Sequence, residues 1–358
     1  YLFLILSSLC FFMFLSALRF NYSVFDISHI RMMILFTLSF LFVVNFVNKR
    51  KSLIVFINYL LKIIIIHAII SVFVLTIFPT NNVLFSDADA STQYVGYFYL
   101  FFQRVNLDYF GNLDPTFVEY FGFKLQRAHG IFWEPGNFAA YANIFLFLNL
   151  YVFKNRNNTI IASLAIILSW SSSGFIVMIS QVVYYFLSLR QVKNFISKFI
   201  ISVFAISLIV NLSFQNLNDK LYGQTSNSGL VRIVNTVISF QTAFEYPLLG
   251  AGVRYATIVS NFNDNFSSSK ALVGQYLSVS NLDEFSFTNS FMRLFIHFGI
   301  IIGLFLLYCV CKQKIIHNNR LLFIFIIILS TSSAPLFFTP FFFIFPISGL
   351  YSLINKNY

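Results

Sequence analysis

Long apolar runs, separated by short polar stretches, follow one another along almost the whole of this sequence. A run such as Ile200–Leu212 would place apolar residues on every face of a helix, which is typical of a segment surrounded by lipid. Hydrophobic residues make up 58% of the 358 residues and charged residues only 10%, and the mean hydropathy is +0.79. This composition excludes a soluble enzyme and predicts a helical membrane protein.

The apolar runs predict about ten spans, each close to the roughly 20 residues that cross a bilayer as a helix. We therefore expect an all-α fold: a polytopic integral membrane helical bundle forming one domain over residues 1–358. The first run is interpreted as a retained helix, and the missing initiator Met suggests a fragment. The predicted spans are 1–18, 30–48, 58–78, 137–153, 159–171, 174–189, 196–213, 289–311, 319–334 and 337–354.

The charges alternate along the chain and predict the topology. Five stretches contain Lys or Arg and no acid, whereas all acidic residues lie in the segments between them. By the positive-inside rule the acid-free stretches are cytoplasmic, which places both termini in the cytoplasm. Two outer loops are long, residues 79–136 and 214–288, and we expect any active site there. The acid-free stretches are Lys49–Lys51, Lys154–Arg156, Arg190–Lys198, Lys312–Arg320 and the one around Lys356.

The first outer loop ends in a polar segment that leads directly into a predicted span. Pro135 suits the first turn of a helix, so Glu134 is predicted to occupy the N-cap at the membrane surface. Helix dipoles stabilise a carboxylate there, which favours an ionised group that serves as a base or pairs with a cation. The alternative is a structural, capping Glu134 paired with Arg127 or another nearby Arg. His129 is a candidate for the same site, although a single His beside an Arg also fits a structural role.

The second outer loop contains a predicted amphipathic helix at the membrane interface, which begins at the Ser/Asn cluster near residue 226 and ends before Pro247. Arg232 lies near its first turns, where the helix dipole disfavours a cation unless an anion is bound. Phosphate is the expected anion, and a headgroup-anchoring Arg is the alternative. The predicted polar face holds Arg232, Asn235, Thr236, Ser239 and Thr242, and the apolar face holds Leu230, Val234, Val237, Ile238 and Phe244.

Pro247–Gly252 (Pro-Leu-Leu-Gly-Ala-Gly) predicts a turn whose backbone comes close to another group, and Arg254 follows it. Arg293 and His297 lie in the predicted span 289–311, where they either line a cavity or cap the bundle.

Neither a metal nor another cofactor is expected. Asp87-Ala-Asp89 resembles the acidic metal motif of soluble sugar transferases, but it is taken as a solvated loop without the strand context of such a site. Cys10, Cys309 and Cys311 all lie in or beside apolar runs, so no disulfide framework is implied.

Three segments resemble the superfamily of O-antigen polymerases and O-antigen ligases, which are bacterial inner-membrane glycosyltransferases. Arg127…Gly130-Ile-Phe-Trp-Glu-Pro-Gly…Tyr141 looks like the family's Arg-x-x-Gly-x-Phe-x-(Glu/Asn)-Pro signature. Gly229-x-x-Arg232 followed by Pro247-Leu-Leu-Gly-x-Gly looks like its large-loop signature. Thr288-Asn289-Ser-Phe with Phe298-Gly-Ile-Ile-Ile-Gly303 looks like the start of the helix after that loop.

The resemblance implies an enzyme of the bacterial inner membrane that uses an oligosaccharide on undecaprenyl pyrophosphate, with membrane lipid around it and no nucleic acid, cofactor or metal. A chain-length regulator is a partner that the family suggests. Guanidinium groups would hold the pyrophosphate, because they contact phosphate bidentately. The expected catalytic residues are Glu134, as the base, and Arg232. The expected substrate-binding residues are Arg127, Arg232, Arg254, His129 and Asn289.

Two other activities compete with polymerisation of repeat units. Ligases of the superfamily, which transfer polymer to lipid A core, usually have a His where this chain has Thr288, and that difference favours the polymerase. A flippase or transporter of the same lipid-linked sugar would carry charges inside its helices and show internal repeats, whereas the spans here contain little charge. A purely structural subunit would not explain Arg232 at a helix start.

Overall fold

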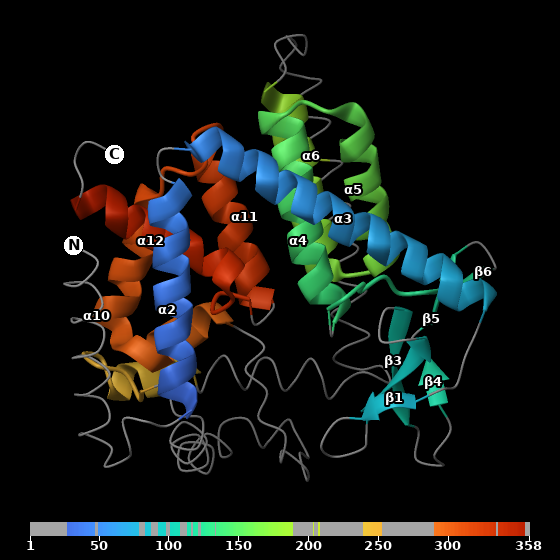
Figure 1. Ribbon diagram of the computed structural model, residues 1–358, viewed down its shortest axis with the longest axis horizontal. Coiled ribbons are helices and arrows are strands. Elements are labelled where there is room, and N and C mark those ends of the chain that lie inside the picture. The colour runs from blue at the N-terminus through green and yellow to red at the C-terminus, as the bar shows by residue number, and fades with distance from the viewer. Residues whose placement is uncertain are drawn as a thin grey trace. The chain divides into compact units, whose positions relative to one another are not determined.

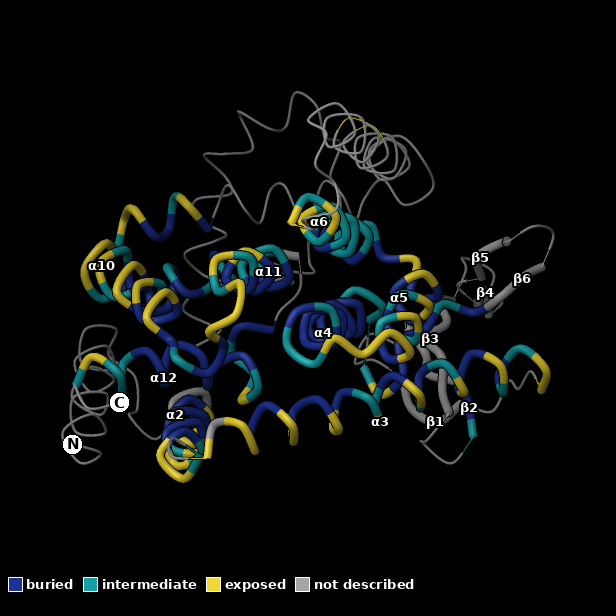
Figure 2. The backbone as a smooth tube through the Cα atoms, turned by 90° about the horizontal axis from the view of Figure 1, so that it is seen from above, coloured by how far each residue is buried: buried dark blue, intermediate teal, exposed yellow. Residues whose placement is uncertain are grey.

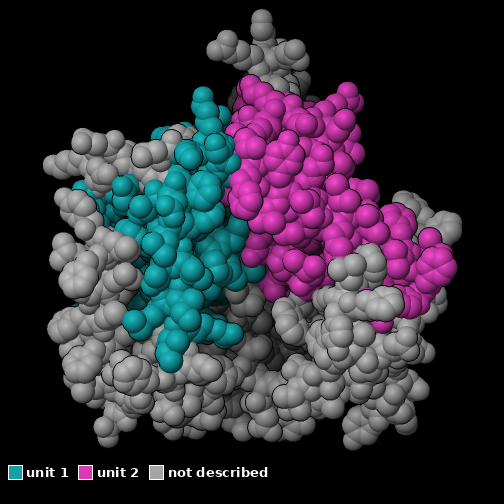
Figure 3. Space-filling view, in the orientation of Figure 1, with its two compact units in different colours: residues 1–53, 216–358 teal, residues 54–215 magenta. Residues whose placement is uncertain are grey.

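The computed structural model is mostly helical, with a small set of strands (Figure 1). Apart from Val203 and Ser207, the residues that it describes are 27–46, 49–78, 83–86, 92–97, 101–107, 113–115, 117–120, 123–132, 134–188, 239–252, 290–333 and 336–354. The chain divides into two compact units, coloured separately in Figure 3. Unit 1 comprises residues 1–53 and 216–358, and unit 2 comprises residues 54–215.

Unit 1 is built around helix α12 (Pro340–Ile354), which packs against α10 (Ser290–Lys312) and α2 (Ile27–Phe46), while α11 (Arg320–Ser333) packs against α10. Phenylalanine rings fill the space between these helices: the ring of Phe36 meets that of Phe343 edge to face, with centroids 4.6 Å apart. Gly349 lets α12 approach α10 closely, because a Cβ at that position would collide with the Cys309 carbonyl.

Unit 2 is built around α4 (Pro135–Phe147), which a π-helical turn, Leu148–Val152, extends. Every residue from Asn137 to Phe147 is buried, and the tube in Figure 2 is dark blue over most of this helix. Helices α5 (Arg156–Ser169) and α6 (Ser172–Ser188) pack against α4. Helix α3 (Arg50–Ile77) begins in unit 1 and continues into unit 2.

Buried amide side chains connect the helices of unit 2. The Asn149 amide nitrogen, in the π-helical turn, donates to Asn58 of α3 at 2.8 Å, and Asn158 of α5 donates to Asn149 at 3.0 Å. In a second group, Asn143 of α4 donates to the Gly174 carbonyl at 3.1 Å and accepts from Gln181 of α6 at 3.0 Å. These bonds cross between helices that have otherwise apolar surfaces, and therefore help to fix their register.

The first predicted outer loop contains short antiparallel strands, which the expectation of an all-α fold did not include. Pairing joins β1, β2, β3 and β4 in that order into one sheet, and β5 and β6 into a second sheet. Thr92 of β2 faces Asn106 of β3, and Glu119 of β5 faces Lys124 of β6. The strands are β1 (Val83–Ser86), β2 (Thr92–Tyr97), β3 (Phe101–Leu107), β4 (Leu113–Pro115), β5 (Phe117–Tyr120) and β6 (Phe123–Gln126).

Every predicted span within the described residues overlaps a helix, although the bounds differ, as for α3, which begins at Arg50 rather than at residue 58. The predicted spans 1–18 and 196–213 lie outside the described residues, apart from Val203 and Ser207. Two helices in the described part are long and apolar enough to cross a membrane, Lys51–Ile77 and Ser290–Lys312. Only 33% of the most apolar window of the first is buried. Its Phe56, Ile63 and Phe73 are 47–67% exposed, which suits a helix in contact with lipid.

Candidate functional site

The segment that begins at Arg127 closes the C-terminal end of α5. The Arg127 guanidinium donates from Nε to the Ser169 carbonyl at 3.2 Å and from Nη2 to the Trp170 carbonyl at 3.0 Å. The Ala128 amide donates to the Leu168 carbonyl at 2.9 Å. The last carbonyls of a helix have no partner within it, and its dipole favours a cation there. Arg127 therefore has a structural role as a C-cap, and the expected contact with substrate stays a prediction.

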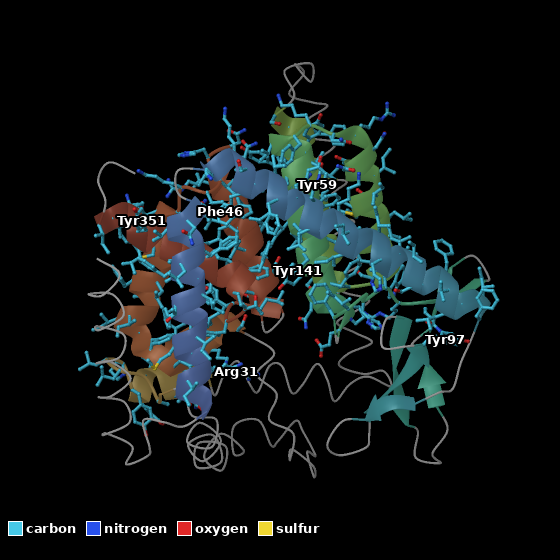
Figure 4. All side chains as sticks on the ribbon, viewed as in Figure 1. Arg31, Phe46, Tyr59, Tyr97, Tyr141 and Tyr351 are labelled. Carbon is cyan, nitrogen blue, oxygen red and sulfur yellow. The ribbon has the colours of Figure 1, made fainter. Side chains whose placement is uncertain are left out.

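Residues 129–132 form a tight turn next to this cap. Gly130 has a φ of +57°, and a Cβ there would lie 2.8 Å from the Ala68 side chain of α3. The buried His129 ring lies with Nδ1 2.8 Å from the Phe132 carbonyl, to which Nδ1–H donates. Phe132 stacks on Tyr141 of α4, labelled in Figure 4, with ring centroids 4.6 Å apart. The turn is thus fixed against two helices just before Glu134.

Glu134 occupies the N-cap of α4, with Pro135 in the first helical turn, as the sequence predicts. Its backbone is extended (φ −135°, ψ 143°), and its carboxylate makes no capping hydrogen bond to the helix. The side chain is partly exposed. This position at the start of α4 is compatible with the expected base, and that role stays a prediction.

In unit 1, the turn Pro247–Gly252 inserts into a break in the backbone of α10. At the break, Gly299 has φ +77° and ψ 171°, a conformation that is essentially confined to glycine. The Ile300 amide donates to the Pro247 carbonyl at 2.8 Å, and the Ile296 carbonyl accepts from the Ala251 amide at 2.7 Å. In an unbroken helix these two α10 groups would bond to each other. The turn thus supplies a partner for each of these two groups.

Glycines allow this close approach on both sides. A Cβ at Gly299 would lie 2.6 Å from the Pro247 carbonyl oxygen, and a Cβ at Gly250 would lie 2.6 Å from the carbonyl carbon of His297. Gly250 itself has a φ of +66°. The prediction that Pro247–Gly252 brings its backbone close to another group is confirmed, and that group is the backbone of α10.

A buried histidine fastens the same turn to α10. His297 is 1% exposed, and its Nδ1 lies 2.7 Å from the Gly252 carbonyl oxygen. Its Nε2 accepts a hydrogen bond from Arg293 Nε at 2.7 Å. The Arg293 guanidinium also lies over the Phe338 ring, 5.6 Å from the centroid. The i, i+4 spacing places Arg293 and His297 on one face of α10, but nothing in that spacing indicates their contact with the glycine turn.

The described end of the predicted amphipathic helix, residues 239–245, is helical and stops before Pro247, as predicted. Its predicted polar face, however, is buried, and its predicted apolar face is exposed. Ser239 and Thr242 of the predicted polar face are 4% and 2% exposed, whereas Phe244 of the apolar face is 69% exposed. In a protein surrounded by lipid, polar side chains turn inward and apolar ones outward. The other predicted face residues lie outside the described part of the chain.

Three of the six candidate residues lie outside the described residues, namely Arg232, Arg254 and Asn289. The others, Arg127, His129 and Glu134, lie on the segment between β6 and α4 in unit 2, which caps the C-terminal end of α5 through Arg127.

The interpretation of Asp87-Ala-Asp89 as a solvated loop, and not as a metal site, assumes that no strand adjoins it. That assumption is wrong, because β1 ends at Ser86, directly before Asp87. Asp87 and Asp89 are themselves outside the described residues. Within the described residues no group of three or more His, Cys, Asp and Glu side chains is placed to hold a metal. Cys309 and Cys311 are free thiols, and Cys10 is outside the described residues.

Comparisons of the chain with known protein families, with characterised proteins and with solved structures give no significant match.

Proposed function

We propose that this protein is a membrane glycosyltransferase that polymerises undecaprenyl-pyrophosphate-linked oligosaccharide repeat units into O-antigen or a related surface polysaccharide. One observation carries the proposal: the Pro247–Gly252 turn is hydrogen-bonded into the break of α10 at Gly299. The resemblance assigns these two segments to separate motifs, and their glycines suit a backbone contact between them. A broken helix whose released groups are bonded by an inserted loop is a common basis for binding sites in membrane proteins.

The proposal includes a topology of about ten spans in the bacterial inner membrane, with both termini in the cytoplasm. The helices that coincide with predicted spans support it, as do the exposed apolar side chains of α3. Periplasmic reporter fusions test this part. Alkaline phosphatase joined after residue 100 should be active, and the same enzyme joined after residue 155 should be inactive.

The proposed reaction joins two carrier-linked oligosaccharides at the periplasmic face. A hydroxyl oxygen of the acceptor sugar attacks the anomeric carbon of the donor and forms the new glycosidic bond. The bond from that carbon to the pyrophosphate oxygen breaks, and the electron pair leaves with undecaprenyl pyrophosphate. Positive groups stabilise the charge that develops on the leaving oxygen, which is often the largest contribution to such catalysis.

Glu134 is the proposed base that takes the proton of the attacking hydroxyl. Its partly exposed carboxylate at the N-cap of α4, without a capping bond, is compatible with this role. Arg232 is the proposed catalytic cation for the leaving pyrophosphate, with Arg254, Asn289 and His129 as substrate-binding residues. Arg127 is included as the residue that fixes the segment before Glu134, through its bonds to the end of α5.

Gel banding of surface polysaccharide from a strain that lacks the gene tests the function. Loss of the ladder, with a single repeat unit still attached to lipid A core, would support the polymerase, and the wild-type gene should restore the ladder. Polymer that accumulates on the lipid carrier would instead indicate a ligase. Unpolymerised units held on the cytoplasmic face would indicate a flippase or transporter.

A further inference from the structure

We propose that Trp170, at the end of α5, is a sugar-binding residue whose indole stacks on a ring of the acceptor oligosaccharide. This inference rests on the proposed function and deepens it, because it names a contact for the sugar and not for the lipid carrier. Three observations carry it: the left-handed backbone of Trp170, the exposure of this residue, and its place beside the start of α4.

Trp170 has a backbone conformation that tryptophan disfavours. Its φ is 48° and its ψ is 41°, in the left-handed region that glycine usually occupies after the last turn of a helix. A residue with a Cβ is strained there, and strain of this kind is concentrated at sites where a side chain has to be held in one place. The strain therefore directs attention to what the indole does.

Three contacts hold Trp170 in this conformation. Its carbonyl accepts from Arg127 Nη2 at 3.0 Å, and its amide donates to the Ile167 carbonyl at 3.1 Å. Its ring meets the ring of Phe175 in α6 edge to face, with centroids 5.6 Å apart. The residue is nevertheless 40% exposed, and because both backbone groups are bonded, this exposure belongs mainly to the indole. The end of α5 thus presents an aromatic ring at the surface in a fixed position.

The hairpin that begins at Trp170 lies against the start of α4. A Cβ at Gly136 would lie 3.9 Å from Ser171 Oγ. Trp170 directly precedes Ser171, and Glu134 lies two residues before Gly136. Arg127 makes a second link, since it bonds to Trp170 and lies on the segment that leads to Glu134. The exposed indole and the proposed base therefore lie at the same end of these helices.

A sugar is the ligand that suits this combination of side chains. The C–H face of a sugar ring is apolar and packs against an aromatic ring, whereas its hydroxyls can donate to a carboxylate. Because Glu134 is the proposed base for the attacking hydroxyl, a sugar bound beside it belongs to the acceptor. A tryptophan that only anchors the protein among lipid headgroups would also expose its indole, and the experiment distinguishes the two roles.

Binding of a free oligosaccharide to the purified full-length protein in lipid nanodiscs tests the inference. The probe is one repeat unit of the host strain's surface polysaccharide, released from its lipid by mild acid, so it carries neither polyprenyl chain nor pyrophosphate. Trp170→Leu keeps an apolar side chain and removes the aromatic face, and should weaken binding about 10-fold in a calorimetric titration. Trp170→Tyr keeps an aromatic face and should retain most of the affinity.

Two further variants separate stacking from folding and from general exposure of aromatic rings. Glycine adopts the φ of Trp170 without strain, so Trp170→Gly should keep the fold and still lose the binding. Phe186→Leu removes another exposed ring, about 20 Å along α6 from its start, and should leave binding unchanged. Wild-type affinity in Trp170→Leu overturns the inference, even if Trp170→Gly fails to fold. Equal weakening in Trp170→Leu and Trp170→Tyr overturns the stacking role.

Fluorescence provides a direct readout of the indole, because the chain contains only two tryptophans, Trp133 and Trp170. In a Trp133→Phe variant all indole emission comes from Trp170. A sugar ring stacked on Trp170 should protect this emission from quenching by acrylamide, since it covers the exposed indole. Unchanged quenching while the oligosaccharide is bound would overturn the inference.

Because binding is measured without turnover, failure of this inference is distinct from failure of the proposed function. A deletion strain whose ladder is unchanged would refute the polymerase, and oligosaccharide binding that depends on Trp170 would still support the sugar site. Loss of the ladder together with binding that does not depend on Trp170 would overturn the sugar site alone.

Discussion

The backbone amide of Ile300 donates to the carbonyl of Pro247 at 2.8 Å, across a gap of more than fifty residues in the sequence. In a regular helix this amide would bond to the Ile296 carbonyl, which here accepts from Ala251 instead. One intrahelical bond is thus exchanged for two bonds to an inserted turn. The exchange is possible because Gly299 adopts a conformation that other residues avoid.

Substitution of Gly299 by Ala should disrupt this exchange. The new Cβ would be strained at φ +77° and would lie 2.6 Å from the Pro247 carbonyl oxygen, so the free energy of unfolding should fall by about 3 kcal/mol. Thermal unfolding of the detergent-solubilised protein measures the loss. Gly136→Ala is the matched control, because its Cβ would have only ordinary contact, 3.9 Å from Ser171 Oγ. A melting temperature in Gly299→Ala equal to that of this control would contradict the proposed strain.

Arg127→Ala should release the C-terminal end of α5. The guanidinium donates to two carbonyls there, so the loss should be about 2 kcal/mol, and Arg127→Lys should recover part of it by restoring the charge. Amide hydrogen exchange over residues 165–175 reports the change directly. If protection in Arg127→Ala equals that of the wild type while polymer is lost, Arg127 contacts the substrate and the cap is secondary.

The bond between Asn58 and Asn149 should show measurable coupling. A double-mutant cycle with Asn58→Ala and Asn149→Ala should give about 1 kcal/mol, the size found for buried polar pairs between membrane helices. Asn157, an exposed residue of α5, provides the control, and its coupling to Asn58 should be zero. Unfolding of the purified variants in detergent supplies the energies. Zero coupling between Asn58 and Asn149 as well would mean that the pair contributes nothing to stability.

Glu134→Gln tests the proposed base. Gln keeps the size of the Glu134 side chain and one of its accepting oxygens, so the free energy of unfolding should change by no more than about 1 kcal/mol. The rate of polymer formation should nevertheless fall about 100-fold or more, because the neutral amide cannot take the proton. Rates measured with carrier-linked repeat units over a range of pH provide the comparison. A normal rate at every pH would leave Glu134 with a structural role only.

Arg232→Ala should abolish polymer and leave the amount of protein in the membrane unchanged. Arg232→Lys should also be impaired, since an ammonium does not reproduce a bidentate contact with phosphate. Ladder length on gels, with immunoblots of membrane fractions, measures both effects. Full activity of the Lys variant would indicate simple charge attraction, and wild-type chain lengths in the Ala variant would exclude an essential anion contact.

Local signals in the sequence predict local features of the fold well. Residues next to each boundary predict three of these features. They are the start of α4 at Pro135, the hairpin between α5 and α6, and the end of the 239–245 helix before Pro247. The close approach at Gly250 was also predicted, because glycine pairs in a turn indicate crowded backbone.

What the sequence did not predict depends on partners far along the chain. Arg127 can be recognised as a cation, but the carbonyls that it caps lie more than forty residues away. The strands of the first loop need a partner strand, and short runs such as Val83–Ser86 carry little periodicity of their own. The periodicity of residues 239–245 predicts a polar and an apolar face, but it does not predict which of them is buried in the protein. The burial of Thr242 was therefore not predicted.

The bonds between residues 247–252 and α10 include three that join backbone groups, and such bonds do not depend on which side chains the turn carries. A chimaera assembled from two homologous proteins could therefore accept a foreign turn, provided that glycine is kept at Gly250 and Gly299 and histidine at His297. A crossover point between residues 253 and 289 would separate the inserted turn from the helix that receives it. Segment exchange at this turn is thus expected to depend on the two glycines and on the His297 side chain.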